Sequence, residues 1–107
     1  MNLETIEQEL RTGQVPPPRL AELRDFLAVE SSSKMDRQDQ LIDLYADYFH
    51  ANRVLHKSDK ATDNAWGMTD LGKEQRRLET YQKRIKLLIG TISSHLRVAE
   101  LQARNLM

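Results

Sequence analysis

A single heptad register runs through the C-terminal third of the chain and constrains the fold more than any other feature. Apolar residues recur every seven positions at Leu71, Leu78, Ile85, Ile92, Ala99 and Leu106. A sustained period of this kind is typical of a helix that packs against other helices along one stripe. The register predicts a helix over residues 70–105, with Thr69 or Asp70 as its N-cap.

Two short helices are predicted near the N-terminus. Leucines and isoleucines spaced three and four apart predict the first over residues 2–12, with Gly13 as its C-terminal cap. The same spacing predicts a second helix over residues 17–28, because a proline is tolerated in its first turn. We expect this second helix to end at the cluster Ser31–Ser33.

A longer apolar pattern predicts a third helix over residues 33–57. One of its faces carries four carboxylates, Asp36, Asp39, Asp43 and Asp47. We interpret this acidic stripe as a solvated or salt-bridged surface. A metal site is disfavoured because one helix face does not supply the full set of oxygen ligands that a divalent cation requires.

The predicted connection between the two long helices is short, and this favours an antiparallel hairpin. A pivot near residue 63 places Asp47 opposite about Glu79, so that basic residues of the last helix lie within reach of the acidic stripe. We therefore expect an all-α fold over residues 1–107, a single domain in which two short N-terminal helices and a long antiparallel helical hairpin form a bundle.

The motifs of enzymes and metal sites are not found in the sequence. His50, His56 and His95 lack the spacing of zinc ligands, and there is no Gly-rich phosphate loop or nucleophile elbow. We expect a non-enzymatic protein with no catalytic residue, metal or cofactor. The chain has no cysteine, no export signal at its start and no long apolar run, so we expect a soluble cytoplasmic protein without membrane contact.

Charge is unevenly distributed although the formal net charge is zero. Residues 1–52 hold ten acidic and five basic side chains, whereas residues 53–86 hold nine basic and five acidic ones. Basic side chains near one end of the hairpin form a candidate phosphate-binding cluster. Its members are Arg53, Lys57, Lys60, Lys73, Arg76, Arg77, Lys83 and Arg84. Acidic residues interleave with the cluster and weaken the case for nucleic-acid binding.

The segment DNAWGMTDLG, residues 63–72, holds the only tryptophan and is predicted to be the turn of the hairpin. In one interpretation Trp66 folds back as an apolar plug near Leu55 and Leu71. In the other, Trp66 and Met68 project as an anchor for a protein partner, since tryptophan is enriched at binding hot spots. The sequence leaves both interpretations open.

The uninterrupted register of the last helix also favours self-association, because this helix is longer than a bundle of 107 residues needs. A monomeric four-helix bundle shows the same spacing and stays an alternative.

Residues 56–105 resemble small helical proteins of unassigned role encoded by bacterial viruses and prophages. In those proteins a Trp-x-x-Thr-x-x-Gly turn, matched here by Trp66, Thr69 and Gly72, precedes a long helix rich in lysine and arginine. The resemblance implies a role as a replication accessory, assembly factor or inhibitor of host machinery, acting in the host cytoplasm. It assigns no functional residue.

Taken together, these patterns predict a non-enzymatic helical protein-interaction module that forms a homo-oligomer. A nucleic-acid-binding accessory protein that uses the basic end of the hairpin is the alternative. Salt dependence distinguishes the two, because phosphate contacts weaken steeply as ionic strength rises. The protein partner, the stoichiometry and the pathway are not indicated by the sequence.

Overall fold

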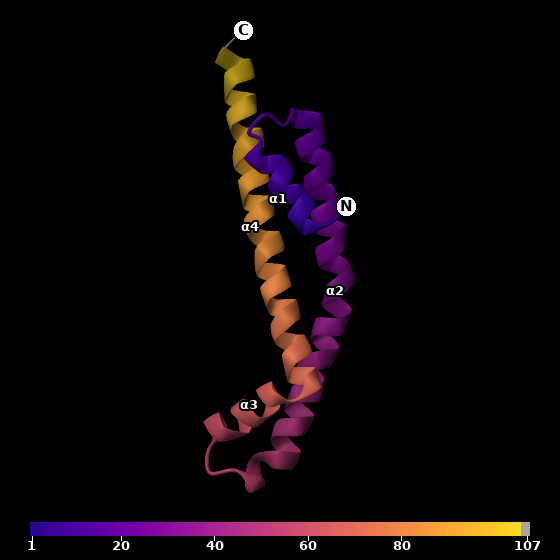
Figure 1. The fold of residues 1–107 in the computed structure, drawn as a ribbon, viewed down its shortest axis with the longest axis vertical. Coiled ribbons are helices and arrows are strands. Elements are labelled where there is room, and N and C mark those ends of the chain that lie inside the picture. The colour runs from indigo at the N-terminus through magenta and orange to yellow at the C-terminus, as the bar shows by residue number, and fades with distance from the viewer. Residues whose placement is uncertain (106–107) are drawn as a thin grey trace. The chain divides into compact units, whose positions relative to one another are not determined.

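The computed structural model describes residues 1–105, which form helices and contain no strand. The all-α prediction is confirmed. The elements are α1 (Leu3–Arg11), α2 (Pro17–Asn52), the 3₁₀ helix η1 (Arg53–Leu55), α3 (Asp59–Met68) and α4 (Asp70–Asn105), as Figure 1 shows. The helix expected over residues 70–105 is α4, and the last position of its register, Leu106, lies outside the described residues.

The predicted break between residues 28 and 33 is wrong, because α2 runs without interruption from Pro17 to Asn52. Ser31–Ser33 contains neither glycine nor proline, so nothing in its backbone forces a helix to end. The Ser31 hydroxyl also donates a hydrogen bond to Oε1 of Gln82 at 2.6 Å, and the Gln82 amide donates to the Ser31 carbonyl at 3.0 Å. A serine hydroxyl bonded to another helix does not compete for its own backbone.

The turn predicted around residue 63 is also wrong, since α3 occupies this segment. Helix α2 ends at Asn52 rather than near residue 57, and η1 follows. Ser58 caps α3 by accepting a hydrogen bond from the Ala61 backbone N–H at 3.1 Å. A serine immediately before Asp59 is a helix start signal that the strong apolar patterns on either side obscured.

Contacts divide the chain into two compact units. Unit 1 comprises residues 1–32 together with the described residues from Gln82 onward. Unit 2 comprises residues 33–81. Both boundaries fall inside helices, so α2 and α4 each contribute one part to each unit.

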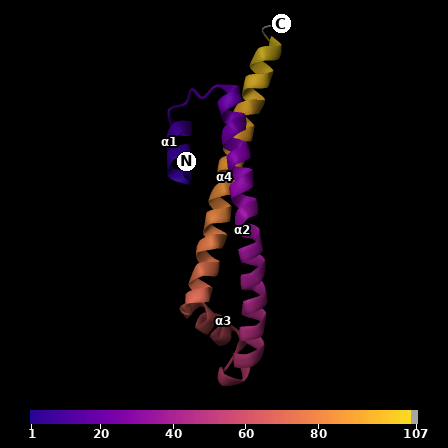
Figure 2. The same cartoon turned by 90° about the vertical axis from the view of Figure 1, so that its right-hand side faces the viewer.

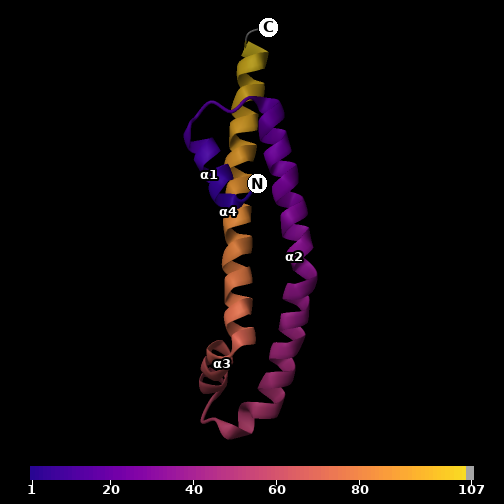
Figure 3. The same ribbon diagram turned by 45° about the vertical axis from the view of Figure 1, so that its right-hand side comes forward.

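Unit 1 is a three-helix arrangement with an aliphatic core. Figure 2 and Figure 3 show α1 beside the parts of α2 and α4 that belong to this unit. Its buried apolar side chains come from all three helices and are Leu3, Ile6, Leu10, Leu20, Leu23, Leu27, Ile85, Leu88 and Ile92. Arg19 donates to both carboxylate oxygens of Glu9 at 2.9 Å, and Arg84 donates to Glu7 at 2.8 Å. These ion pairs fasten α1 to α2 and to α4.

Unit 2 is built from the later part of α2, η1, α3 and the start of α4, and Figure 3 shows α3 lying across the beginning of α4. Leu41, Thr62 and Trp66 are its buried side chains. Arg37 donates to both carboxylate oxygens of Glu74 at 2.6 and 2.7 Å. The predicted register would have set Arg37 opposite about residue 89, so that register, including Asp47 opposite Glu79, is wrong. The shift arises because η1 and α3 stand where a simple turn was predicted.

Candidate interaction surfaces

A tight corner joins α3 to α4 and explains the three residues of the Trp-x-x-Thr-x-x-Gly motif. Thr69 is the single residue between the two helices. Its backbone N–H and its hydroxyl both donate to the Trp66 carbonyl, at 2.9 and 2.6 Å, and the hydroxyl accepts from the Gly72 N–H at 3.0 Å. The Trp-x-x-Thr-x-x-Gly pattern is thus a structural device that ends one helix and caps the next.

Gly72 is required at this corner because the backbone of α3 comes too close for a side chain. A Cβ atom at position 72 would lie 2.0 Å from the carbonyl oxygen of Trp66 and 2.7 Å from its carbonyl carbon. Gly90 lies in the same helix, yet a Cβ atom there meets no atom within 4 Å among the described residues. The backbone therefore excludes a side chain at position 72 and leaves room for one at position 90.

We expect Gly72→Ala to lower the free energy of unfolding by about 3 kcal/mol, since backbone atoms must move to accept the methyl group. Gly90→Ala is the matched control, and we expect it to raise the free energy of unfolding by about 1 kcal/mol through helix propensity alone. Chemical denaturation followed by circular dichroism measures both changes. Equal effects of the two substitutions would contradict the close approach at the corner.

Trp66 is buried inside unit 2, with 6% of its surface exposed. Its ring packs against Tyr45 and Tyr48 at centroid distances of 5.7 and 5.3 Å, and its Nε1–H donates to Oε1 of Gln75 at 2.7 Å. This placement agrees with the plug interpretation and not with a projecting anchor. Leu55, which was expected near the plug, is 73% exposed and is not one of the buried side chains of this unit.

Met68 differs from Trp66, although the two were proposed as one partner-binding pair. It is 76% exposed at the end of α3, so it lies on the surface of unit 2. The structure therefore separates the two residues into a buried aromatic and an exposed apolar side chain.

The predicted basic cluster is divided between the two units. Lys83 and Arg84 belong to unit 1, where Arg84 pairs with Glu7. The other members belong to unit 2 and are Arg53, Lys57, Lys60, Lys73, Arg76 and Arg77. Arg53 is engaged locally, because it donates to Asp59 at 2.6 Å and to the His56 carbonyl at 2.9 Å.

Three of the interleaved acidic residues have structural partners in unit 2. Arg37 lowers the pKa of Glu74 by donating to its carboxylate. Asp63 accepts a hydrogen bond from the Tyr45 hydroxyl, which raises the pKa of that phenol. Asp59 pairs with Arg53. These contacts stabilise the fold of unit 2 and leave Lys57, Lys60, Lys73, Arg76 and Arg77 on its surface.

Helix α2 presents an exposed acidic surface in unit 2, which we call the acidic face. It consists of the four carboxylates Asp36, Asp39, Asp43 and Asp47 beside the apolar row Met35, Ile42 and Ala46. Met35 and Ile42 are 53% and 54% exposed. Among residues 1–105 none of these carboxylates forms an ion pair, so the predicted pairing of the stripe with basic residues of the last helix is not observed.

Helix α4 presents a surface of opposite charge in unit 1, which we call the basic face. It consists of Lys83, Lys86, Arg97 and Arg104 beside the apolar row Leu87, Val98 and Leu101. Leu87 is 72% exposed. A shallow hollow lies over Gly90, lined by Lys83, Lys86, Leu87, Thr91 and Ser94. Of these four basic residues only Lys83 belongs to the predicted phosphate-binding cluster, because the heptad register of this helix indicates its buried side and not its outer surface.

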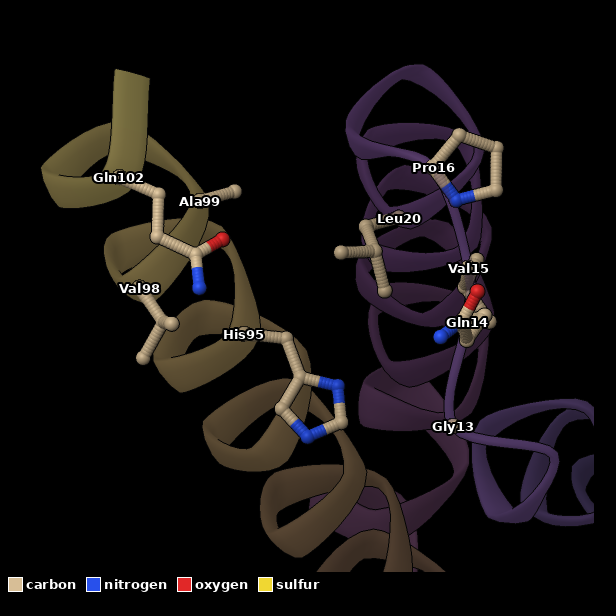
Figure 4. A pocket seen from close by; sticks show the side chains of 9 residues that line it. All are labelled: Gly13, Gln14, Val15, Pro16, Leu20, His95, Val98, Ala99 and Gln102. Carbon is tan, nitrogen blue, oxygen red and sulfur yellow. The ribbon is translucent and has the colours of Figure 1, made fainter. Parts of the chain in front are cut away.

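Unit 1 also contains an open groove of about 590 Å³ between the α1–α2 connection and α4. Figure 4 shows His95 extending from α4 and Leu20 from α2 toward the space between the helices, with Gly13–Pro16 alongside. His95 is the only titratable side chain among the lining residues. The groove therefore lacks a second ionisable group to pair with the imidazole in acid–base chemistry.

Within residues 1–105 no three histidine, cysteine or acidic side chains gather closely enough to hold a metal ion. In the same range, no helix has an apolar stretch long enough to cross a bilayer.

Comparison with known proteins finds no matching family model, no matching curated protein and no matching solved structure.

Proposed function

We propose that this protein is a non-enzymatic helical interaction module that associates with itself. The observation that carries the proposal is the exposure of large apolar side chains in rows on the acidic face and on the basic face. Apolar side chains rimmed by charged ones are typical of protein-binding surfaces. Each unit offers one such surface, so each copy has two places at which a helical partner can pack.

The scaffold suits this role because both faces lie on long helices and not on loops. In unit 1, α2 and α4 are joined by the Ser31–Gln82 hydrogen bonds and by the shared packing of α1. In unit 2 the Arg37–Glu74 pair and the aromatic cluster of Trp66 hold the helices. We propose that these helices form a bundle with coiled-coil-like packing, in which a rigid outer surface is available for docking.

The likeness to small phage-encoded helical proteins fits an accessory or assembly role of this kind. Its three motif residues, Trp66, Thr69 and Gly72, are engaged in the α3–α4 corner. They therefore have a structural role in this chain, and the proposed function depends on the exposed faces instead.

Nucleic-acid binding is the second candidate function. It is favoured by five exposed basic side chains of unit 2, two around the start of α3 and three in the first turns of α4: Lys57, Lys60, Lys73, Arg76 and Arg77. Asp70 and Glu79 are exposed in the same region and reduce the positive charge that a phosphate backbone would meet.

Light scattering with and without a short oligonucleotide, at low and moderate salt, tests both functions. Self-association gives a solution mass above the 12.4 kDa of one chain without any oligonucleotide. A protein that stays at 12.4 kDa at every concentration would contradict the proposal. A mass that changes only when the oligonucleotide is added at low salt would favour the second candidate.

A further inference from the structure

We infer that the acidic face of one copy binds the basic face of a second copy. This inference rests on the proposed self-association and names the surfaces that carry it. The two faces have opposite charge, both include exposed apolar side chains, and both lie on α-helices. A second copy of the chain is thus a partner of matching chemistry for each face.

On the acidic face, charge and apolar surface form two parallel rows. At about 100° per residue, Met35, Ile42 and Ala46 fall within about 40° of one another around the helix. The carboxylates of Asp36, Asp39, Asp43 and Asp47 are centred about 80° clockwise of that row when the helix is viewed from its N-terminus. Lysine and arginine are not found among the exposed residues of α2 between Ser33 and Asn52.

The basic face has the same two rows in the opposite order. Leu87, Val98 and Leu101 form its apolar row. Lys83, Lys86, Arg97 and Arg104 are centred about 70° anticlockwise of that row in the same view. Between the charged side chains the helix surface forms a shallow depression, because Gly90, Ser93 and Ser94 have small side chains or none.

This reversed order makes the faces complementary in one orientation. When two helices run parallel and face each other, the clockwise side of one meets the anticlockwise side of the other. The apolar rows then meet each other and the carboxylates meet the ammonium and guanidinium groups. In an antiparallel contact the carboxylates would face the apolar row of α4 instead. We therefore assign a parallel contact between the acidic face of α2 and the basic face of α4 in the second copy.

The charges on both faces are available for this contact. Arg84 and Arg37 form ion pairs within the chain, with Glu7 and Glu74, and neither belongs to a face. Among the described residues, neither the four carboxylates nor the four basic side chains of the faces take part in such pairs. Docking thus requires no internal ion pair to break.

Charge reversal on each face, followed by mixing, tests the inference. The first variant carries Asp36→Lys, Asp39→Lys and Asp43→Lys, and the second carries Lys83→Glu, Lys86→Glu and Arg97→Glu. All six positions are exposed, so circular dichroism should show an unchanged helical fold. We expect each variant alone to associate more weakly than the wild type, on the order of tenfold to a hundredfold, because like charges then oppose each other.

An equimolar mixture of the two variants should recover the wild-type mass. One variant then has two basic faces and the other has two acidic ones, so they pair only with each other. The matched control carries Arg24→Glu and Asp25→Lys, which reverse exposed charges outside both faces and outside the candidate phosphate-binding cluster and should leave the association unchanged.

Several outcomes would overturn the inference in distinguishable ways. A wild-type protein that is monomeric at all concentrations would contradict both the proposed function and the inference. A wild type that associates while both variants keep its mass leaves the proposed function standing and shows that other surfaces are used. Variants that lose association without rescue on mixing show that the two faces do not meet. If only the second variant has a phenotype, and it is loss of oligonucleotide binding, the basic face serves nucleic acid.

Discussion

Replacing Trp66 by alanine is expected to lower the free energy of unfolding by about 3–5 kcal/mol, the cost typical of removing a buried tryptophan. The indole fills the interior of unit 2 between Tyr45 and Tyr48, and its Nε1–H bonds Gln75. Truncation leaves a cavity and an unsatisfied Gln75 oxygen. Unit 2 has few other buried side chains with which to compensate, so we expect the loss near the upper end of that range.

Met68→Ala is the matched control, two residues further along the same helix. Met68 is exposed, so its truncation is expected to change the free energy of unfolding by no more than about 0.5 kcal/mol. Thermal and chemical denaturation monitored by circular dichroism measure both variants. A Trp66→Ala protein as stable as the wild type would contradict the burial of the indole.

The second large effect is expected in unit 1. Ile85 and Ile92 belong to the heptad register and are 1% and 0% exposed. Alanine at either position should cost about 2–5 kcal/mol, through lost apolar burial and the cavity left behind. Leu87 lies between them in sequence but is exposed on the basic face, so Leu87→Ala should change stability by no more than about 0.5 kcal/mol. Similar losses at all three positions would mean that the assigned face of α4 is wrong.

The register of α4 was predictable because it depends on a repeated pattern. Ile85 and Ile92 are buried where the seven-residue spacing placed them, and α4 begins at Asp70 as the capping residues indicated. The heptad register is defined by many apolar residues, so one polar residue out of place does not obscure it. The all-α class followed from the same reasoning.

Helix boundaries were harder to predict, because each depends on one or two contacts. Ser31–Ser33 looks like a helix end in the sequence, and the bond to Gln82 that keeps it helical comes from a residue far along the chain. The α3 helix was missed because Ser58 is a single capping residue in a polar stretch. Once α3 was taken for a turn, the register of Arg37 with Glu74 was necessarily displaced.

The candidate site was predicted less well than the fold. Trp66 was considered as an anchor because tryptophan is common at interfaces, yet its burial depends on Tyr45 and Tyr48 from another helix. The acidic stripe was recognised from its spacing alone. The basic face was not predicted, because its charges are widely spaced along α4 and the heptad register dominates the pattern of that helix.

Unit 2 has fewer buried apolar side chains than unit 1, so we expect it to unfold locally more often. Nine buried aliphatic side chains hold unit 1, and the buried side chains of unit 2 are Leu41, Thr62 and Trp66. Regions with few buried apolar contacts lie at the low end of local stability. Backbone amides of α3 should therefore exchange with deuterium through local unfolding, faster than those near Ile85 and Ile92. The acidic face is carried by the unit that opens more readily, so a bound second copy would slow exchange there most.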